Sequence, residues 1–271
     1  MPDRTRARRL AGRRDLLRAS ACLAAWGLTR AAAASPVLSG LQSPETTPAL
    51  HLDLPQLEYA GSWNPRPGAM RKLASELRLR TRLEPRHEPT TVTAESPALF
   101  ATPFLYVAGE RSLPSLGAAA EARLRRFVDL GGLLLFDAAD GGVDLQFERD
   151  AKALLARVLP GSTLTPIAAD HVLFRSFYLV DEPVGRTSTF DHVLGIQEEG
   201  RIKVLLMRND LGGALALRPD GLWAYPCTPG GPAQREQAVQ FAVNILLYAT
   251  CTDYKSDRAH VETLLRSRNW R

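Results

Sequence analysis

The sequence predicts an α/β protein with a mainly parallel sheet, and two strand–helix pairs carry that prediction. Residues 104–108 and 133–136 are short, wholly apolar runs, which is typical of strands buried on both faces. A helical repeat of apolar residues follows each run, first over residues 118–130 and then up to Val158. Because strand and helix alternate at this spacing, right-handed crossovers should place the strands side by side and parallel.

The segment before these pairs should add two strands and a helix. Leucines alternate with polar residues from residue 50, which predicts a first strand running toward Tyr59. A loop rich in Gly and Pro then leads to apolar residues at helical spacing, so we expect a helix over residues 67–80. A second short strand is expected at residues 81–85.

The second half of the chain is less regular. Residues 193–197 and 202–207 have the pattern of a hairpin closed by Glu-Glu-Gly at 198–200. A long helix is expected over residues 233–248, and a last short helix over residues 258–267.

The first 34 residues have the pattern of an export signal. Arg13 and Arg14 precede a short apolar segment, residues 16–28, as in the twin-arginine pattern. A run of alanines then offers a signal-peptidase site before Ser35. We therefore expect a periplasmic or otherwise extracytoplasmic protein, exported by the twin-arginine pathway.

The domain organisation follows from this signal. Residues 1–34 are predicted to be the twin-arginine signal peptide, residues 35–49 a flexible linker rich in Ser, Pro and Thr, and residues 50–271 a single α/β domain. No apolar run approaches the roughly 20 residues of a bilayer span, so the protein should not span a membrane after signal cleavage.

The charge of the chain is unevenly placed. The first 34 residues hold eight arginines and two aspartates, so 26 of the 34 basic and 27 of the 29 acidic residues lie beyond them. Without a net basic domain, a nucleic-acid partner is not expected. The cysteines of the domain, Cys227 and Cys251, are expected to be buried thiols.

Sequence motifs exclude several classes of site. No GxGxxG or GxxxxGK[ST] phosphate loop occurs, and the histidines show no HExxH spacing, so neither a nucleotide cofactor nor a metal is expected. No GxSxG or GxCxG nucleophile elbow occurs either. We therefore assign no catalytic residue and expect no cofactor.

A few polar and aromatic residues remain as candidates for ligand binding. Asp137 directly follows a predicted strand, where parallel sheets bind ligands, although an Asp there can equally cap the next turn. Trp63 and Asn64 could stack on and bond a sugar-like ligand, but an aromatic in such a loop more often holds the loop to its own core. His171 and Asp170 are neighbours and would point to opposite faces of a strand, so they form no local acid–base pair.

A series of segments within residues 50–271 carries a family resemblance. These segments are residues 59–65, 103–109, 124–137, 170–178, 208–211, 244–248 and 253–261. In this order they resemble the bacterial domain-of-unknown-function family 4159. The resemblance adds His171, Asn209, Asp210 and His260 to Asp137 as candidate ligand-binding residues, because they lie in the resembling segments.

The resemblance also implies an architecture. The family is similar to the class I glutamine-amidotransferase-like fold, which is a three-layer, flavodoxin-like sandwich. The amidotransferase cysteine nucleophile has no counterpart in this sequence, and Ala138 stands where a second acidic residue would be expected.

Two functional hypotheses follow. In the first, the protein is a non-catalytic binding or assembly module that contacts an envelope protein or a small ligand. In the alternative, it is a periplasmic hydrolase acting on a saccharide or peptide-like substrate through Asp137 and His171. The two hypotheses differ in whether the fold brings these residues to one open cleft.

Overall fold

The computed structural model describes residues 52–267, with the side chains of residues 52–250. They belong to one unit, Ala49–Arg271. The predicted signal peptide, residues 1–34, and the predicted linker, residues 35–49, lie outside the described residues.

The described residues form a seven-stranded sheet with the strand order β2-β1-β3-β4-β7-β6-β5. All neighbouring strands pair in parallel except β6, which is antiparallel to both β7 and β5. The run β2-β1-β3-β4-β7 reproduces the flavodoxin-like order, with β7 in the fifth place. The strands are β1 (Gln56–Leu57), β2 (Thr91–Val92), β3 (Phe104–Gly109), β4 (Leu133–Ala138), β5 (Thr165–Pro166), β6 (Leu194–Glu198) and β7 (Arg201–Met207).

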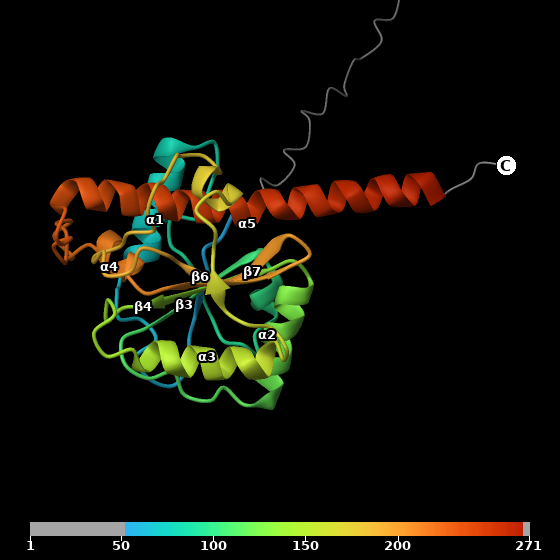
Figure 1. Cartoon of the computed structure of the whole chain (residues 1–271), viewed down its shortest axis with the longest axis horizontal. Helices are drawn as coiled ribbons and strands as arrows, with labels where there is room; N and C mark the ends of the chain where they lie inside the picture. The colour runs from blue at the N-terminus through green and yellow to red at the C-terminus, as the bar shows by residue number, and fades with distance from the viewer. Residues whose placement is uncertain (1–51, 268–271) are drawn as a thin grey trace, which may run out of the picture. The chain divides into compact units, whose positions relative to one another are not determined.

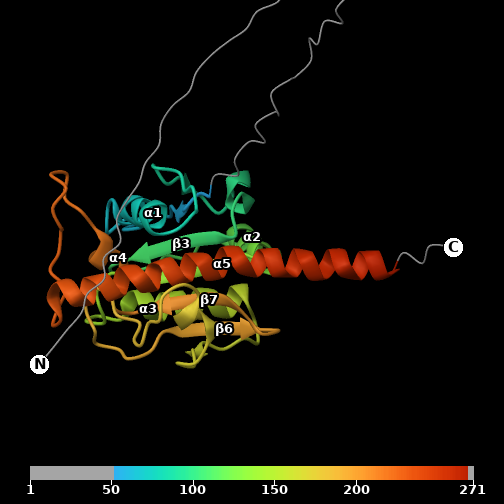
Figure 2. The ribbon, with the colours of Figure 1, turned by 90° about the horizontal axis from the view of Figure 1, so that it is seen from above.

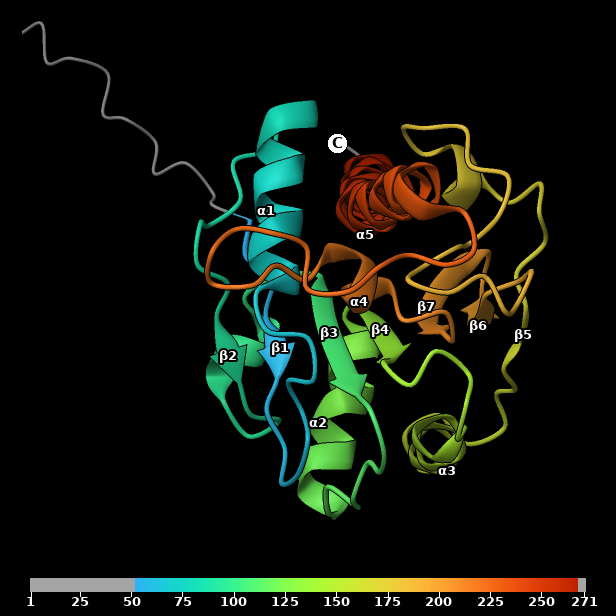
Figure 3. The same cartoon turned by 90° about the vertical axis from the view of Figure 1, so that its left-hand side faces the viewer.

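Helices cover both faces of this sheet (Figures 1 and 3), so the predicted three-layer α/β sandwich is confirmed. One face carries α1 (Ala69–Arg80), α4 (Leu211–Leu215) and α5 (Gly231–Ser267), and the other carries α2 (Ala118–Asp129) and α3 (Gln146–Val158). Two short 3-10 helices lie in the connections, η1 (Pro97–Phe100) and η2 (Val172–Arg175).

The core consists of two apolar clusters, one on each face of the sheet. Strands β3 and β4 are buried along their whole length, as their apolar runs predict. Side chains alternate between the clusters, so that Leu135 packs toward α1 and α5 while Leu134 packs toward α2 and α3. The sheet therefore draws its stability from both layers of helices.

The predicted hairpin is also confirmed. Strands β6 and β7 pair antiparallel, and Glu198 lies opposite Arg201. Glu199 and Gly200 make the turn with φ values of 52° and 75°. Two successive positive φ values are those of a type I′ turn, whose twist matches that of the strands.

The prediction for the first strands is wrong in extent. Pairing is limited to Gln56–Leu57 in β1, and Leu52 makes only an isolated bridge to Pro85. Residues 81–85 form no strand, and β2 lies further along the chain, at Thr91–Val92. Asp53 is one physical reason. Its carboxylate accepts hydrogen bonds from the amide N–H of Leu54 and from the N–H and hydroxyl of Thr90, and these bonds replace the regular backbone bonds of a strand.

The two predicted C-terminal helices are a single helix, α5. Neither Gly nor Pro occurs between Tyr248 and residue 258, so nothing in the sequence stops the helix there. At 1.5 Å per residue its 37 residues extend about 55 Å. The helix begins across the sheet and continues beyond it (Figures 1 and 2).

Two smaller expectations concern the cysteines and the membrane. Cys227 is a buried free thiol, as expected, whereas the side chain of Cys251 lies outside the described residues. In the part of the chain that the structure describes, no helix is both long and apolar enough to cross a bilayer.

Candidate functional site

Asp137 lies at the carboxyl end of β4, and its side chain has no exposed surface. Oδ1 accepts the amide N–H of Leu211 at 2.9 Å. Oδ2 accepts the amide N–H of Gly212 and the hydroxyl of Tyr106, each at 2.6 Å. Both carboxylate oxygens are thus bonded within the protein.

Gly212 is needed for this close packing. A Cβ atom at this position would lie 2.4 Å from the hydroxyl oxygen of Tyr106 and 3.0 Å from Oδ2 of Asp137. Only glycine lets the α4 backbone approach the carboxylate so closely.

Asp210 forms the second buried carboxylate, directly before α4. Its backbone is left-handed, with φ 53°, and Oδ1 accepts the amide N–H of Gly213 at the start of α4. Arg66 donates to it through Nε and Nη2, each at 2.9 Å, and Arg186 donates a further bond. We refer to Arg66, Tyr106, Asp137, Arg186 and Asp210 as the carboxyl-edge cluster.

Arg66 covers the cluster and shields it from solvent. Its side chain is 5% exposed and also donates to the carbonyl oxygens of Ala139 and Pro65. The ring of Tyr225 stacks on its guanidinium at 4.4 Å. Burial opposes the charge of Arg66, but the bonds to Asp210 outweigh it and raise the pKa of the guanidinium. Arg66 therefore stays charged and fixed.

The two buried acids also affect each other. Burial, followed by the negative charge of Asp210, raises the pKa of Asp137 above its ordinary value, against the hydrogen bonds it accepts. Burial likewise raises the pKa of Tyr106. A raised carboxyl pKa is common in general acids. Here, however, no face of Asp137 is open to a substrate.

The crevice in which sheets of this strand order usually bind ligands is also filled by side chains. In a flavodoxin-like sheet it lies beyond the carboxyl ends of β1 and β3. The hydroxyl of Tyr59 donates to the carbonyl of Ala108 at 2.7 Å, and Phe147 is fully buried beside Gly109. A Cβ atom on Gly109 would lie 2.2 Å from the Phe147 ring. Side chains of the protein therefore occupy the place where open α/β sheets of this order commonly bind a ligand.

Asn209 is the third candidate at this edge, and it also has structural partners. Its Oδ1 accepts the amide N–H of Phe190 at 3.0 Å. Its Nδ2 donates to the carbonyls of Pro183 and Phe190 at 3.0 and 2.7 Å. The side chain holds the segment between β5 and β6 against the end of β7.

His171 lies at the opposite end of the sheet. It precedes η2, where its Nδ1 accepts the amide N–H of Leu173 at 3.1 Å, and its ring packs 5.6 Å from that of Tyr248. The Tyr248 hydroxyl accepts the amide N–H of Ile202, near the start of β7, whereas Asp137 pairs with Met207 at its end. Five residues of strand span roughly 17 Å, so the structure does not bring His171 and Asp137 together.

The remaining candidates lie apart from the cluster. Trp63 is half-buried against the apolar cluster on the α2 and α3 face, and its carbonyl accepts Nε2 of Gln56 at 2.9 Å. Asn64 Oδ1 is 3.5 Å from the same nitrogen. His260 lies in α5, and its side chain is outside the described residues.

Sequence reasoning missed the cationic half of the cluster. Arg66 and Arg186 occur in irregular segments without periodicity, so nothing marked them as partners of the buried Asp210. The only available signal was the count of acidic residues at the sheet edge, since buried carboxylates require cations. No three His, Cys, Asp or Glu side chains gather as metal ligands among the residues that the structure describes.

Together, the strand order and the filled edge define a flavodoxin-like α/β protein whose usual ligand crevice is closed. Residues 53–250 match the family described as "Domain of unknown function (DUF4159)". Since this is most of the chain, the protein belongs to that family. No curated protein matches it.

Proposed function

We propose that the protein is a non-catalytic binding or assembly module of the cell envelope, built on an amidotransferase-like fold. The observation that carries this proposal is the closed carboxyl edge, where Asp137 and Asp210 have no exposed surface and all their bonds are made within the protein. An enzyme of this architecture would need that edge open to substrate.

The amidotransferase-like relation is part of the same proposal. The flavodoxin-like strand order supports it. The last residue of β3 and the one that follows it, Gly109 and Glu110, offer no nucleophile at the turn. Such a protein would keep the fold of an enzyme but would bind a partner through its surface and catalyse no reaction.

An apolar surface next to α5 is suited to a protein partner. Val172, Phe177 and Leu179 are 49%, 50% and 85% exposed, and we call them the η2 patch. Asn244 fixes this segment, because its Oδ1 accepts the amide N–H groups of Phe177 and Tyr178 at 3.1 and 2.8 Å. A rigid exposed apolar patch is typical of an interaction site.

Export to the envelope is the second part of the proposal. Arg13, Arg14 and the apolar segment after them support it. The partner is accordingly an extracytoplasmic protein.

Cross-linking and affinity purification of the full chain from its native cell test the binding role. We expect one envelope protein to be recovered with the wild type and with Val143→Ser, an exposed control outside the patch. The double variant Phe177→Ser/Leu179→Ser should lose it while keeping the wild-type melting temperature. Retention of the partner by the double variant would contradict the proposed surface.

An activity assay tests the alternative that the protein is a hydrolase. If the purified protein cleaves a saccharide or a peptide, and His171→Asn abolishes the turnover without loss of stability, the non-catalytic role must be abandoned.

A further inference from the structure

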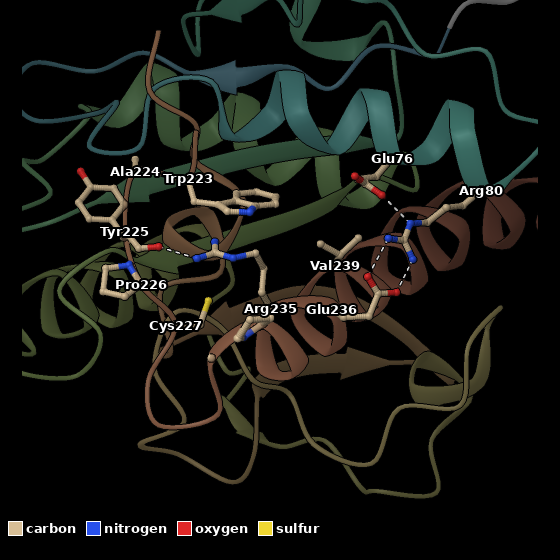
Figure 4. A pocket seen from close by; sticks show the side chains of 12 residues that line it. Glu76, Arg80, Trp223, Ala224, Tyr225, Pro226, Cys227, Arg235, Glu236 and Val239 are labelled. Carbon is tan, nitrogen blue, oxygen red and sulfur yellow. Dashed lines mark hydrogen bonds and ion pairs between the residues drawn. The ribbon is translucent and has the colours of Figure 1, made fainter. Parts of the chain in front are cut away.

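A pocket of about 560 Å³ opens between α1, the segment 223–227 and the first turns of α5 (Figure 4). Its size lies within the range of roughly 300–1,000 Å³ that is common for small-molecule sites. Trp223 and Arg235 border one side, and Glu76, Arg80 and Glu236 border the other. Val239 lies between them, so the pocket combines apolar surface with fixed polar groups.

We propose that this pocket binds an uncharged saccharide. The inference goes beyond the binding role proposed above, which names neither this pocket nor a small ligand.

The charged side chains of the pocket are already paired or poorly exposed. Arg80 donates to both oxygens of Glu236, one of them at 2.8 Å, and to Glu76. Arg235 donates to the carbonyls of Ala214 and Tyr225. The lining itself holds two cations and two carboxylates, and Lys72, just outside it, pairs with Glu76 at 2.5 Å. Arg80 is paired with both carboxylates, and Arg235 is only 8% exposed, so the lining offers no well-exposed cation to a phosphate or carboxylate ligand. An ammonium ligand would have to compete with Arg80 for Glu76 or Glu236.

Two groups of the pocket lining have hydrogen-bonding capacity that the protein does not use. The Glu236 side chain is 46% exposed, and a carboxylate has about four acceptor positions, of which Arg80 and Gln240 use only some. The indole N–H of Trp223 has no partner among the described residues, and the residue is 42% exposed. A hydroxyl group both donates and accepts, so the hydroxyls of one saccharide can satisfy the indole on one side of the pocket and the carboxylate on the other.

The side chains on both sides of the pocket are held in place by their neighbours. Trp223 packs against two cations, with Arg235 at 4.2 Å and Lys72 at 5.3 Å from its ring centroid. The ion pairs of Arg80 hold the opposite wall. Groups fixed in this way lose little conformational entropy when a ligand binds.

A peptide fits the pocket less well than a saccharide. Extended peptides bind through free backbone groups of an exposed strand. Here the carbonyl of Tyr225 is taken by Arg235, the carbonyl of Cys227 by the amide N–H of Gly231, and the N–H of Ala224 by the carbonyl of Ala216. The groups that remain available are side-chain groups, which suit hydroxyls.

Calorimetric titration of the full chain tests this inference. The probes are the neutral trisaccharides maltotriose, cellotriose, mannotriose and chitotriose, with inorganic phosphate and triglycine as comparison ligands. We expect at least one trisaccharide to bind with a Kd below about 1 mM, and neither comparison ligand to bind.

Two variants locate the binding. Trp223→Phe keeps an aromatic ring but removes the N–H, and Glu236→Gln keeps the shape but removes the charge; each should weaken binding about tenfold. Leu222→Ala, next to Trp223 but outside the lining, should bind like the wild type. Melting curves of all variants separate lost binding from lost folding.

Three outcomes would overturn the inference: no trisaccharide binds at about 10 mM, binding persists unchanged in both variants, or phosphate or triglycine binds in preference. None of them affects the envelope partner of the η2 patch, so this inference and the proposed function fail separately.

Discussion

At the scale of single residues, the burial of Asp137 makes it a determinant of stability. Asp137→Ala would leave the N–H groups of Leu211 and Gly212 and the hydroxyl of Tyr106 without an acceptor. Since each buried unsatisfied group costs about 1–3 kcal/mol, we expect the free energy of unfolding to fall by about 3–5 kcal/mol in urea denaturation.

Asp144→Ala is the matched control for Asp137→Ala. Its side chain is 62% exposed, so its loss should change the unfolding free energy by less than about 0.5 kcal/mol. A loss of under about 1 kcal/mol for Asp137→Ala would mean that water reaches the carboxylate and that the edge is open.

His171 should make the protein less stable in mild acid. Burial lowers the pKa of His171 below its ordinary value, although Asp170 opposes the shift. The unfolded chain therefore takes up the proton at a higher pH than the folded one. The stabilisation is complete above an unfolded pKa of about 6.5 and is lost as the pH falls through the lower folded pKa.

Chemical denaturation between pH 8 and pH 5 measures this effect. His171→Asn can still accept the N–H of Leu173 but does not titrate, so its unfolding free energy should fall less steeply than that of the wild type. Equal slopes for the two proteins would show that His171 is freely protonated in the folded state.

The candidate site was only partly predictable at this scale. Asp137 could be placed at the carboxyl edge because it directly follows an apolar run predicted to be a strand, whereas Asp210 became a candidate only through the family resemblance. The partner of Asp210, Arg66, lies 144 positions before it, in a loop of prolines and glycines without periodicity. Long-range side-chain pairing of this kind leaves no local pattern, so the sequence did not reveal that the edge is closed.

At the scale of elements, β4 is the centre of the sheet and should tolerate truncation poorly. Leu134 is fully buried between β3 and β7 and packs against the α2 and α3 layer. Leu134→Ala should lower the unfolding free energy by about 2–5 kcal/mol in urea denaturation. Leu130→Ala, at a position 63% exposed, should change it little, and a loss below about 1 kcal/mol at Leu134 would contradict two-sided burial.

Elements with strong local patterns were predicted well, and those defined by tertiary contacts were not. The apolar runs of β3 and β4 and the turn at Glu199 and Gly200 are visible in the sequence. Helix α4 contains Gly212 and Gly213 and has no helical pattern of its own. It forms because Asp137 and Asp210 accept its first amide N–H groups.

At the scale of the whole molecule, export should depend on the paired arginines. The double variant Arg13→Lys/Arg14→Lys should leave the precursor inside the cell, because the twin-arginine pathway reads the guanidinium pair. Cell fractionation with N-terminal sequencing measures this. A variant that still yields an external protein beginning at Ser35 would refute the assignment of the pathway.

The carboxyl-edge cluster also limits the order in which the protein can fold. Its arginine at position 66 is made early during synthesis, whereas its acceptor at position 210 is separated from it by 144 positions. Until Asp210 and α4 have been synthesised, the guanidinium of Arg66 and the carboxylate of Asp137 lack the partners that make their burial favourable. A chain ending before α4 should therefore keep its sheet edge hydrated and loosely packed, so that closure of this edge is a late event in folding.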